Sequence, residues 1–288
     1  MIVGIVGSGL IGSSLLRAIR ANDSAVRTRV LDANPEHVRQ LAALQPGVEA
    51  CERLEELARG ADLVFVCTPV KAVADIVCAL IPLVSSSCVL TDVGSAKVSI
   101  IAKVQARFPD FTRFVPGHPM AGGEAAGPAH GTAELFRNRR YLLTPYDGVD
   151  DGAIERVAAF VGELGAQVSR MTPERHDEII ALVSHLPHLY AFALMGAAAE
   201  ETQALGADVL AYAAGGFRDV TRIAAADARM WLDIFEENEA FLTRSYELAK
   251  AHMEGLLDAV RRRDSERVAE ILTASRRLRL EMNGDMQP

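Results

Sequence analysis

Apolar residues are grouped in two different ways along the chain, and the change comes near residue 171. In the first half, short apolar runs closed by Gly, Pro or Asp alternate with stretches of helical spacing. The strand-like runs are 1–7, 28–33, 62–69, 87–94, 112–119, 139–145 and 166–171. The helical stretches between them include 11–21, 35–44, 54–60, 97–108 and 153–165. This alternation predicts an α/β fold with a parallel sheet covered by helices.

From Thr172 onward the pattern is almost wholly helical. Thr172 can cap a helix and Pro173 fits its first turn, after which apolar residues recur at a period of 3.6 through residues 178–201. Pro187 should kink this helix. We therefore expect two domains, an α/β domain over 1–171 and an all-helical domain over 172–288.

Composition favours a folded protein that binds a small molecule. Half of the residues are apolar, 24% are charged and the formal net charge is −8. Nucleic acids and anionic membranes need clustered positive charge, and the one basic run, 261–279, has the pattern of a solvated helix face. We expect neither nucleic acid nor membrane as a partner.

The cysteines indicate a reducing compartment. Cys51, Cys67, Cys78 and Cys88 form no CxxC pair and no zinc-ligand spacing, so we expect small core residues and no metal site. Residues 1–7 predict a strand and a turn rather than a signal peptide, and no apolar run reaches the ~18 residues of a membrane span. These features favour a cytoplasmic protein.

A glycine motif lies between the first strand and the first helix. Gly7 permits a tight turn, Gly9 lets the backbone approach a pyrophosphate, and Gly12 lets the helix pack on the strand. Asp32 closes the second strand, where a carboxylate accepts hydrogen bonds from ribose hydroxyls and repels a 2′-phosphate. The motif predicts NAD rather than NADP, and a flavin is less compatible because no further nucleotide-contact segment is apparent. The remaining expected cofactor contacts are Leu10, Ile11, Thr68 and Pro69.

Three of the seven histidines are candidates for chemistry. His118 follows a strand at its carboxyl end, where open α/β sheets place reactive groups, and His185 and His188 lie on the helix with Pro187. Polar surroundings predict surface positions for the other four, which are His37, His130, His176 and His252.

Five segments together resemble the prephenate dehydrogenase family. They are GSGLIGSS, TDVGSAK, GHPMAGGE, SHLPH and GGFRDVTRIA, in this order, and the resemblance covers almost the whole chain. It implies a Rossmann NAD-binding domain joined to a helical dimerisation domain, a substrate cleft between the two, and a homodimer.

The resemblance also implies roles for individual residues. His118 would accept the proton of the substrate 4-hydroxyl, Ser95 would bridge hydroxyl, histidine and cofactor, and Arg222 would hold a substrate carboxylate. The other matching pocket positions are His188, Glu124, Gly215, Asp219 and Trp231. Many members carry Ser or Thr where this chain has Gly123, which removes one side-chain contact to the substrate.

Two residues of the TDVGSAK segment also have purely structural interpretations. Taken alone, Ser95 could be a turn residue or a helix cap as readily as a functional residue, and Lys97 is expected on the surface of a first helical turn.

Four functions remain open at this point. The first is NAD-dependent oxidative decarboxylation of prephenate to 4-hydroxyphenylpyruvate on the route to tyrosine. The second is the same chemistry on arogenate, or on both substrates in a cyclohexadienyl enzyme. A β-hydroxyacid dehydrogenase is less compatible, because it would normally use a lysine on the long helix and 174–201 contains none. The fourth is an NAD-sensing dimer without catalysis.

Overall fold

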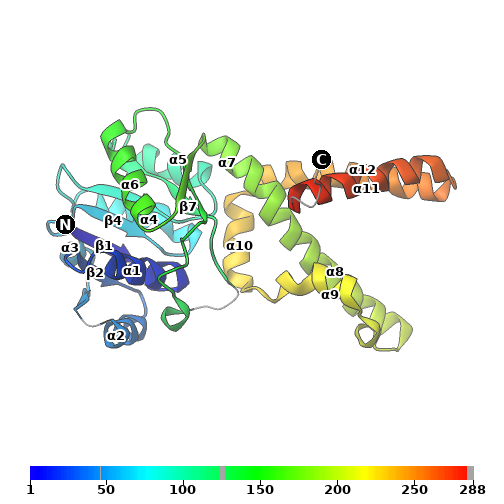
Figure 1. Ribbon diagram of the computed structural model, residues 1–288, viewed down its shortest axis with the longest axis horizontal. Coiled ribbons are helices and arrows are strands. Elements are labelled where there is room, and N and C mark those ends of the chain that lie inside the picture. The colour runs from blue at the N-terminus through cyan, green and yellow to red at the C-terminus, as the bar shows by residue number, and fades with distance from the viewer. Residues whose placement is uncertain (46, 124–126, 284–288) are drawn as a thin grey trace. The chain divides into compact units, whose positions relative to one another are not determined.

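The computed structural model describes residues 1–45, 47–123 and 127–283. The chain forms two compact units, Met1–Glu239 and Ala240–Pro288. The predicted helical domain, 172–288, is thus divided between the two units. Residue 171 is where the mixed strands and helices give way to helices alone. A domain boundary at this residue stays a prediction. Figure 1 shows the chain coloured from its N-terminus to its C-terminus.

The first unit is built on a six-stranded parallel sheet in the order β3-β2-β1-β4-β5-β6. Its strands are β1 Ile2–Val6, β2 Arg27–Leu31, β3 Glu49–Ala50, β4 Leu63–Val66, β5 Val89–Asp92 and β6 Phe114–Val115. This is the strand order of a Rossmann sheet. Successive strands are added on one side of β1 up to β3 and on its other side from β4 onward. In such sheets ligands bind at the carboxyl ends of the strands, where the order reverses. The predicted parallel sheet is confirmed.

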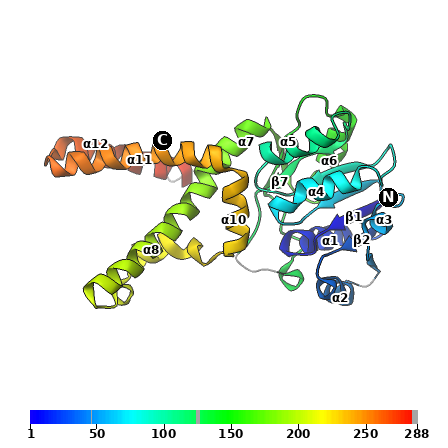
Figure 2. The ribbon, with the colours of Figure 1, turned by 180° about the vertical axis from the view of Figure 1, so that it is seen from behind.

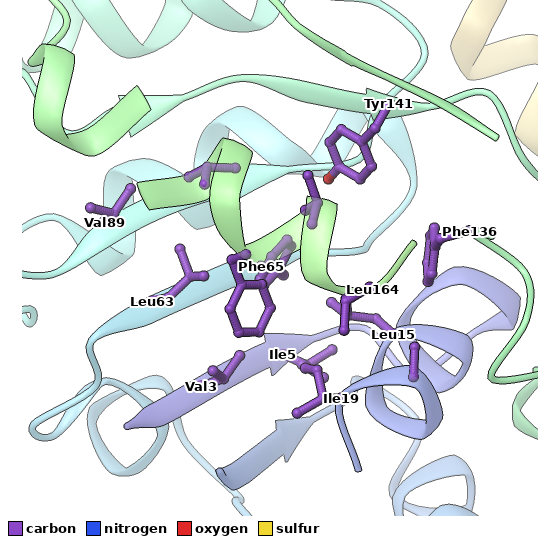
Figure 3. Packing of buried hydrophobic residues seen from close by; sticks show 14 of the residues in the cluster. Val3, Ile5, Leu15, Ile19, Leu63, Phe65, Val89, Phe136, Tyr141 and Leu164 are labelled. Carbon is purple, nitrogen blue, oxygen red and sulfur yellow. The ribbon is translucent and has the colours of Figure 1, made fainter. Parts of the chain in front are cut away.

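Helices cover both faces of this sheet (Figures 1 and 2). They are α1 Leu10–Asn22, α2 Pro35–Leu44, α3 Leu54–Ala58, α4 Val70–Leu80, α5 Val98–Arg107 and α6 Asp151–Glu163. Because strand side chains alternate, Ile5 and Phe65 pack toward α1 and α6, while Val64 and Val66 pack toward α3, α4 and α5. Figure 3 shows the first of these cores around Phe65. The ring centroids of Phe65 and Phe160 lie 5.7 Å apart.

A second, three-stranded sheet carries the strand that holds His118. It consists of β7 Gly117–Pro119, β8 Arg140–Leu143 and β9 Gln167–Arg170, with β7 antiparallel and β9 parallel to β8. The sequence predicts one strand over 112–119, but the structure divides it at Pro116, which cannot donate a ladder hydrogen bond. The division moves His118 out of the parallel sheet and onto β7. A short 3₁₀ turn, η1 Pro128–His130, follows.

After β9 the described chain contains only helices and turns, as predicted. The elements are α7 Pro173–Ile180, η2 Ala181–His185, α8 Leu186–Leu205, η3 Val209–Tyr212, α9 Gly215–Thr221, η4 Arg222–Ala225, α10 Ala228–Glu237, α11 Glu239–Arg261 and α12 Ser265–Asn283. Helix α10 packs on α4 (Figure 2), so Trp231 and Ile234 belong to the second core of the Rossmann sheet.

The irregularity predicted at Pro187 takes the form of a π-helical turn. The Leu186 N–H donates to Ala181 O, five residues back, over the segment Ala181–His185. Pro187 has no N–H to give to the carbonyl four residues before it, and its ring would crowd that carbonyl. The wider π turn relieves both problems and sets the direction in which His185 and His188 leave the helix.

The helical run Pro173–Leu205 is long and apolar enough to cross a membrane by length and composition alone. No uninterrupted apolar run of about 18 residues is needed for this, because the polar residues within the helical run are too few to lower its mean hydropathy. Only 28% of its most apolar window is buried within the chain, so most of this surface is available to another molecule.

Candidate functional site

The glycine loop between β1 and α1 has the geometry that its sequence predicts. Gly7 has φ +94°, a conformation that residues with a side chain rarely adopt. A Cβ at Gly12 would lie 1.9 Å from Gly7 O, so only glycine allows α1 to approach the loop. A Cβ at Gly9 would meet nothing within 4 Å, and no described side chain caps α1 at this residue. The loop therefore leaves open space in front of the unfilled N–H groups of α1.

Asp32 lies beside this loop, immediately after β2. Its Oδ2 accepts hydrogen bonds from Ser8 N at 2.6 Å and Ser8 Oγ at 2.8 Å, and its Oδ1 accepts one from Asn34 N at 2.8 Å. Between β4 and α4, at the same edge, Thr68 Oγ1 is buried and has no partner among the described residues. A carboxylate, an unpartnered hydroxyl and an open helix N-terminus fit the ribose and pyrophosphate of a dinucleotide.

His118, on β7, contacts a second histidine that the sequence did not single out. His118 Nδ1 lies 2.8 Å from His176 Nε2, and the two rings meet edge to face with centroids 5.0 Å apart. His176 Nδ1 in turn lies 2.7 Å from Asp177 Oδ1. The predicted surface position of His176 is wrong, since its side chain is fully buried at the interface of α7 with β7.

Lys97 is also buried, contrary to the prediction of a surface position. Its ammonium forms an ion pair with Asp92, at the end of β5, and donates to Gly117 O at 2.8 Å. This residue therefore ties the β5–α5 turn to the strand next to His118. Removing one partner of a buried ion pair typically costs about 3–5 kcal/mol, so we expect the loss of Asp92 or Lys97 to destabilise the fold.

The buried surroundings keep the site histidines neutral. Burial lowers the pKa of His118 well below its usual value, and the neighbouring His176 and Lys97 lower it further because positive charges on these groups would repel one another. Burial also lowers the pKa of His176, although the hydrogen bond to Asp177 opposes the shift. A neutral His118 is the form that can accept a proton.

The helical segment contributes a second group of site residues around Trp231. The His188 ring stacks on the Trp231 ring with centroids 3.6 Å apart, and His188 Nδ1 lies 2.9 Å from Ser184 O. Burial lowers the pKa of His188, and so does the nearby guanidinium of Arg222. The structure thus brings together three of the predicted pocket residues, His188, Arg222 and Trp231.

His185 and Asn238 connect this group to the His118 group. The His185 ring meets the Trp231 ring edge to face at 6.0 Å, and Asn238 Nδ2 lies 3.0 Å from both His185 Nδ1 and Asp177 O. Burial lowers the pKa of His185 to about 4. The two groups of residues are therefore parts of one continuous site.

For the other predicted site residues among those described, the structure gives a position and an exposure but no contact with His118 or Trp231. Ser95 is half-buried in the turn between β5 and α5. Its side chain does not cap that helix, whose N-cap residue is Lys97, and the Lys97 side chain does not cap it either. Gly215 and Asp219 are exposed on α9, and Gly123 is exposed in the loop after β7. Glu124 lies outside the described residues.

The sequence contains a signal for the residues that were missed. Pro173, His176, Asp177 and Ile180 follow the i, i+3, i+4, i+7 spacing of one helix face, and all four are buried. The polar composition of 173–178 conceals this face.

Two family models together match almost the whole chain. Residues 15–170 match the nucleotide-binding domain of prephenate dehydrogenase, and residues 172–274 match its dimerization domain. The chain belongs to the prephenate dehydrogenase family. The resemblance in five sequence segments is confirmed, and with it the Rossmann domain followed by a helical domain. A β-hydroxyacid dehydrogenase is no longer a candidate.

Individual members of the prephenate dehydrogenase family cover the full length. A cyclohexadienyl dehydrogenase of Zymomonas mobilis is 36% identical over 98% of this chain and 96% of its own. The crystal structure of prephenate dehydrogenase from Aquifex aeolicus, in complex with hydroxyphenyl propionate and NAD+, has a TM-score of 0.92 and 30% identity, covering 98% of both chains. An arogenate dehydrogenase structure from Synechocystis has a TM-score of 0.82 and 27% identity, covering 98% of this chain and 100% of its own. All three relatives are named as dehydrogenases, and their names give different substrates.

Proposed function

We propose that this member of the prephenate dehydrogenase family catalyses the NAD-dependent oxidative decarboxylation of prephenate to 4-hydroxyphenylpyruvate in tyrosine biosynthesis. The observation that carries the proposal is His118, held neutral by burial and bonded through Nδ1 to His176, which leaves Nε2 to accept a proton. The glycine loop, Asp32 and Thr68, at the carboxyl edge of the sheet, support NAD as the cofactor.

The residues of the glycine loop would hold this cofactor. The N-terminus of α1, with Gly9, Leu10 and Ile11, fits the pyrophosphate, Asp32 fits the ribose hydroxyls, and Thr68 and Pro69 flank the same edge. When bound, NAD supplies the acceptor for the hydride that leaves C4 of the substrate.

His118 would act on the substrate hydroxyl. As the C4 hydride leaves, the O–H bond breaks and its proton forms a bond to His118 Nε2, so that oxygen becomes a carbonyl. The C1 carboxylate then leaves as CO₂, its bonding electrons make the ring aromatic, and the oxygen takes the proton back from His118. A general base of this kind contributes roughly 10²–10⁴-fold, and positioning of the substrate supplies much of the rest.

The remaining residues would position the substrate. Arg222 can hold a carboxylate through two parallel hydrogen bonds. His188, stacked on Trp231, donates from Nδ1 to Ser184 O and so offers the lone pair of Nε2 to a donor of the substrate. We propose that Ser95 bridges the hydroxyl and His118, and Glu124, Gly215 and Asp219 remain proposed pocket positions. We further propose a homodimer, on the strength of the dimerization domain, and a cytoplasmic location, which four free thiols favour.

Arogenate is the second candidate substrate, either alone or beside prephenate. Two observations favour it: the similarity to a cyclohexadienyl dehydrogenase, and Gly123, which provides no side chain to distinguish a keto group from an amine.

Parallel assays of NADH absorbance with prephenate and with arogenate test the substrate. The proposal expects at least a tenfold higher kcat/KM for prephenate. Equal values would identify a dual-specific enzyme, a preference for arogenate would identify an arogenate dehydrogenase, and reduction of NAD by neither compound would refute the proposed activity.

A further inference from the structure

His176 and Asp177 lie at the buried face of α7 and form a chain of hydrogen bonds that ends at His118. The chain runs from Asp177 Oδ1 to His176 Nδ1 over 2.7 Å, and from His176 Nε2 to His118 Nδ1 over 2.8 Å. His176 is fully buried and Asp177 is 1% exposed, so water does not compete for these bonds.

The donors and acceptors allow one arrangement of protons when both rings are neutral. An ionised carboxylate only accepts, so His176 Nδ1 must carry hydrogen and donate to Asp177. His176 Nε2 is then an acceptor, and His118 Nδ1 must carry hydrogen and donate to it. The lone pair of His118 is therefore on Nε2.

Asp177 is itself held in place by three backbone N–H and amide groups. Its carboxylate accepts hydrogen bonds from Lys97 N at 2.9 Å and from Val98 N at 2.8 Å, and its backbone oxygen accepts one from Asn238 Nδ2 at 3.0 Å. The carboxylate thereby caps the N-terminus of α5, where a negative charge is favoured. These donors hold the carboxylate so that Oδ1 faces His176 Nδ1.

We infer that His176 and Asp177 are positioning residues, which hold His118 in the tautomer with hydrogen on Nδ1 and direct its Nε2 toward the substrate. The tautomer follows from the contacts alone, whereas its consequence for the rate rests on the proposed function. Because Asp177 also caps α5, one carboxylate fixes both the histidine and the turn that carries Ser95.

Replacement of Asp177 by asparagine gives the sharpest test. In Asp177→Asn the amide oxygen can still accept from Lys97 N and Val98 N, while its NH₂ group faces His176 Nδ1. His176 Nδ1 must then accept, Nε2 must carry hydrogen, and His118 must accept at Nδ1 and carry hydrogen on Nε2. The variant therefore reverses both tautomers with little change in shape.

The tautomers are read from ¹H–¹⁵N correlation spectra of the full chain labelled at histidine nitrogens, at a pH above neutrality. His118→Asn and His176→Gln assign the two rings. The wild-type protein should show hydrogen on Nδ1 of His118 and Asp177→Asn should show it on Nε2. With prephenate and NAD, kcat of Asp177→Asn should fall about 10²–10⁴-fold while the Kd for NAD stays within about twofold.

Two further variants complete the design. Asp62→Asn makes the same change at a carboxylate that accepts from Ile2 N, away from the site, and should leave the tautomer and kcat unchanged. In the background of His176→Gln, adding Asp177→Asn should lower kcat less than threefold more, since Asp177 acts through His176. His176→Gln alone should lower kcat at least tenfold, which keeps the test available if Asp177→Asn does not fold.

The outcomes separate this inference from the proposed function. Hydrogen on Nε2 of wild-type His118, or an unchanged tautomer in Asp177→Asn, would overturn the inference whatever the activity. The expected tautomers in a protein that oxidises neither prephenate nor arogenate would sustain the positioning of His118 and overturn only the proposed activity.

Discussion

At the scale of single residues, the site depends on histidines that stay uncharged. His118 is faced by His176 from α7, by Lys97 from the start of α5 and by His185 from the π turn, and each of these lowers its affinity for a proton. The carboxylates of Asp92 and Asp177 lie behind Lys97 and His176 and are occupied by them. The site therefore holds a base whose protonated form is disfavoured before substrate binds.

This arrangement predicts an unusual pH dependence. Since the pKa of His118 lies well below 6.5, kcat/KM for prephenate should stay constant as pH falls from 8 through 6.5 and should decline only at lower pH, when the imidazole gains a proton. The measurement is kcat/KM against pH at saturating NAD, with circular dichroism to exclude unfolding at each pH. A decline centred at or above pH 6.5 would contradict the assigned environment of His118.

The sequence could predict His118 but not its partners. His118 and the glycine loop belong to short motifs whose chemistry can be inferred locally, whereas His176 acquires its role from a residue 58 positions away. Lys97 was misplaced for the same reason, because its burial depends on the carbonyl of Gly117, 20 residues further along the chain. Contacts of this kind depend on tertiary packing, which a single sequence does not display.

At the scale of elements, the strand–loop–helix unit at the N-terminus determines where a cofactor can bind. Gly12 permits α1 to contact the loop at Gly7 O, while Gly9 faces open space and has a backbone conformation, φ −63° and ψ −162°, that other residues can adopt. Gly12 is therefore needed for the packing of α1 on the loop, whereas Gly9 leaves room for a cofactor to approach the backbone.

Alanine at each of these glycines should separate the two purposes. Gly12→Ala places a Cβ against backbone and should lower the stability by at least about 2 kcal/mol, in the range of overpacked sites. Gly9→Ala should leave the melting temperature within about 2 °C and raise the Kd for NAD at least tenfold, because its methyl group occupies the space that the pyrophosphate needs. Differential scanning fluorimetry and fluorescence titration with NAD give the two values. Unchanged NAD binding in Gly9→Ala would place the cofactor elsewhere.

The division of the predicted strand 112–119 also belongs to this scale. The hydrophobic pattern was correct for both halves, but it could not show that Pro116 ends one sheet and starts another. That division gives His118 an antiparallel neighbour in β8 and brings it to α7.

At the scale of the molecule, one copy of the chain leaves much of the apolar run Pro173–Leu205 uncovered, since only 28% of its most apolar window is buried. Leu182, Val183, Leu194 and Leu205 are exposed on it. An exposed apolar surface of this kind marks an interface, and the match of 172–274 to a dimerization domain indicates a second copy as its partner.

A charge on this surface should therefore weaken the dimer. We expect a dimer at micromolar concentration by analytical ultracentrifugation, and Leu194→Glu should raise its dissociation constant at least 100-fold, because a carboxylate would have to be buried. Leu44→Glu, at an exposed leucine on α2, is the matched control and should leave the dimer intact. If the wild-type protein is a monomer, or if the two substitutions weaken the dimer equally, the run Pro173–Leu205 is not the dimer interface.

The proposed reaction requires His118 to accept the proton of the substrate hydroxyl while NAD is reduced. Its most direct test is the rate of NADH formation from prephenate by the wild-type protein and by His118→Asn, with NAD binding to both measured by fluorescence. We predict that His118→Asn lowers kcat at least 10²-fold and leaves the Kd for NAD within about twofold. A variant that keeps most of its kcat would contradict the role of His118.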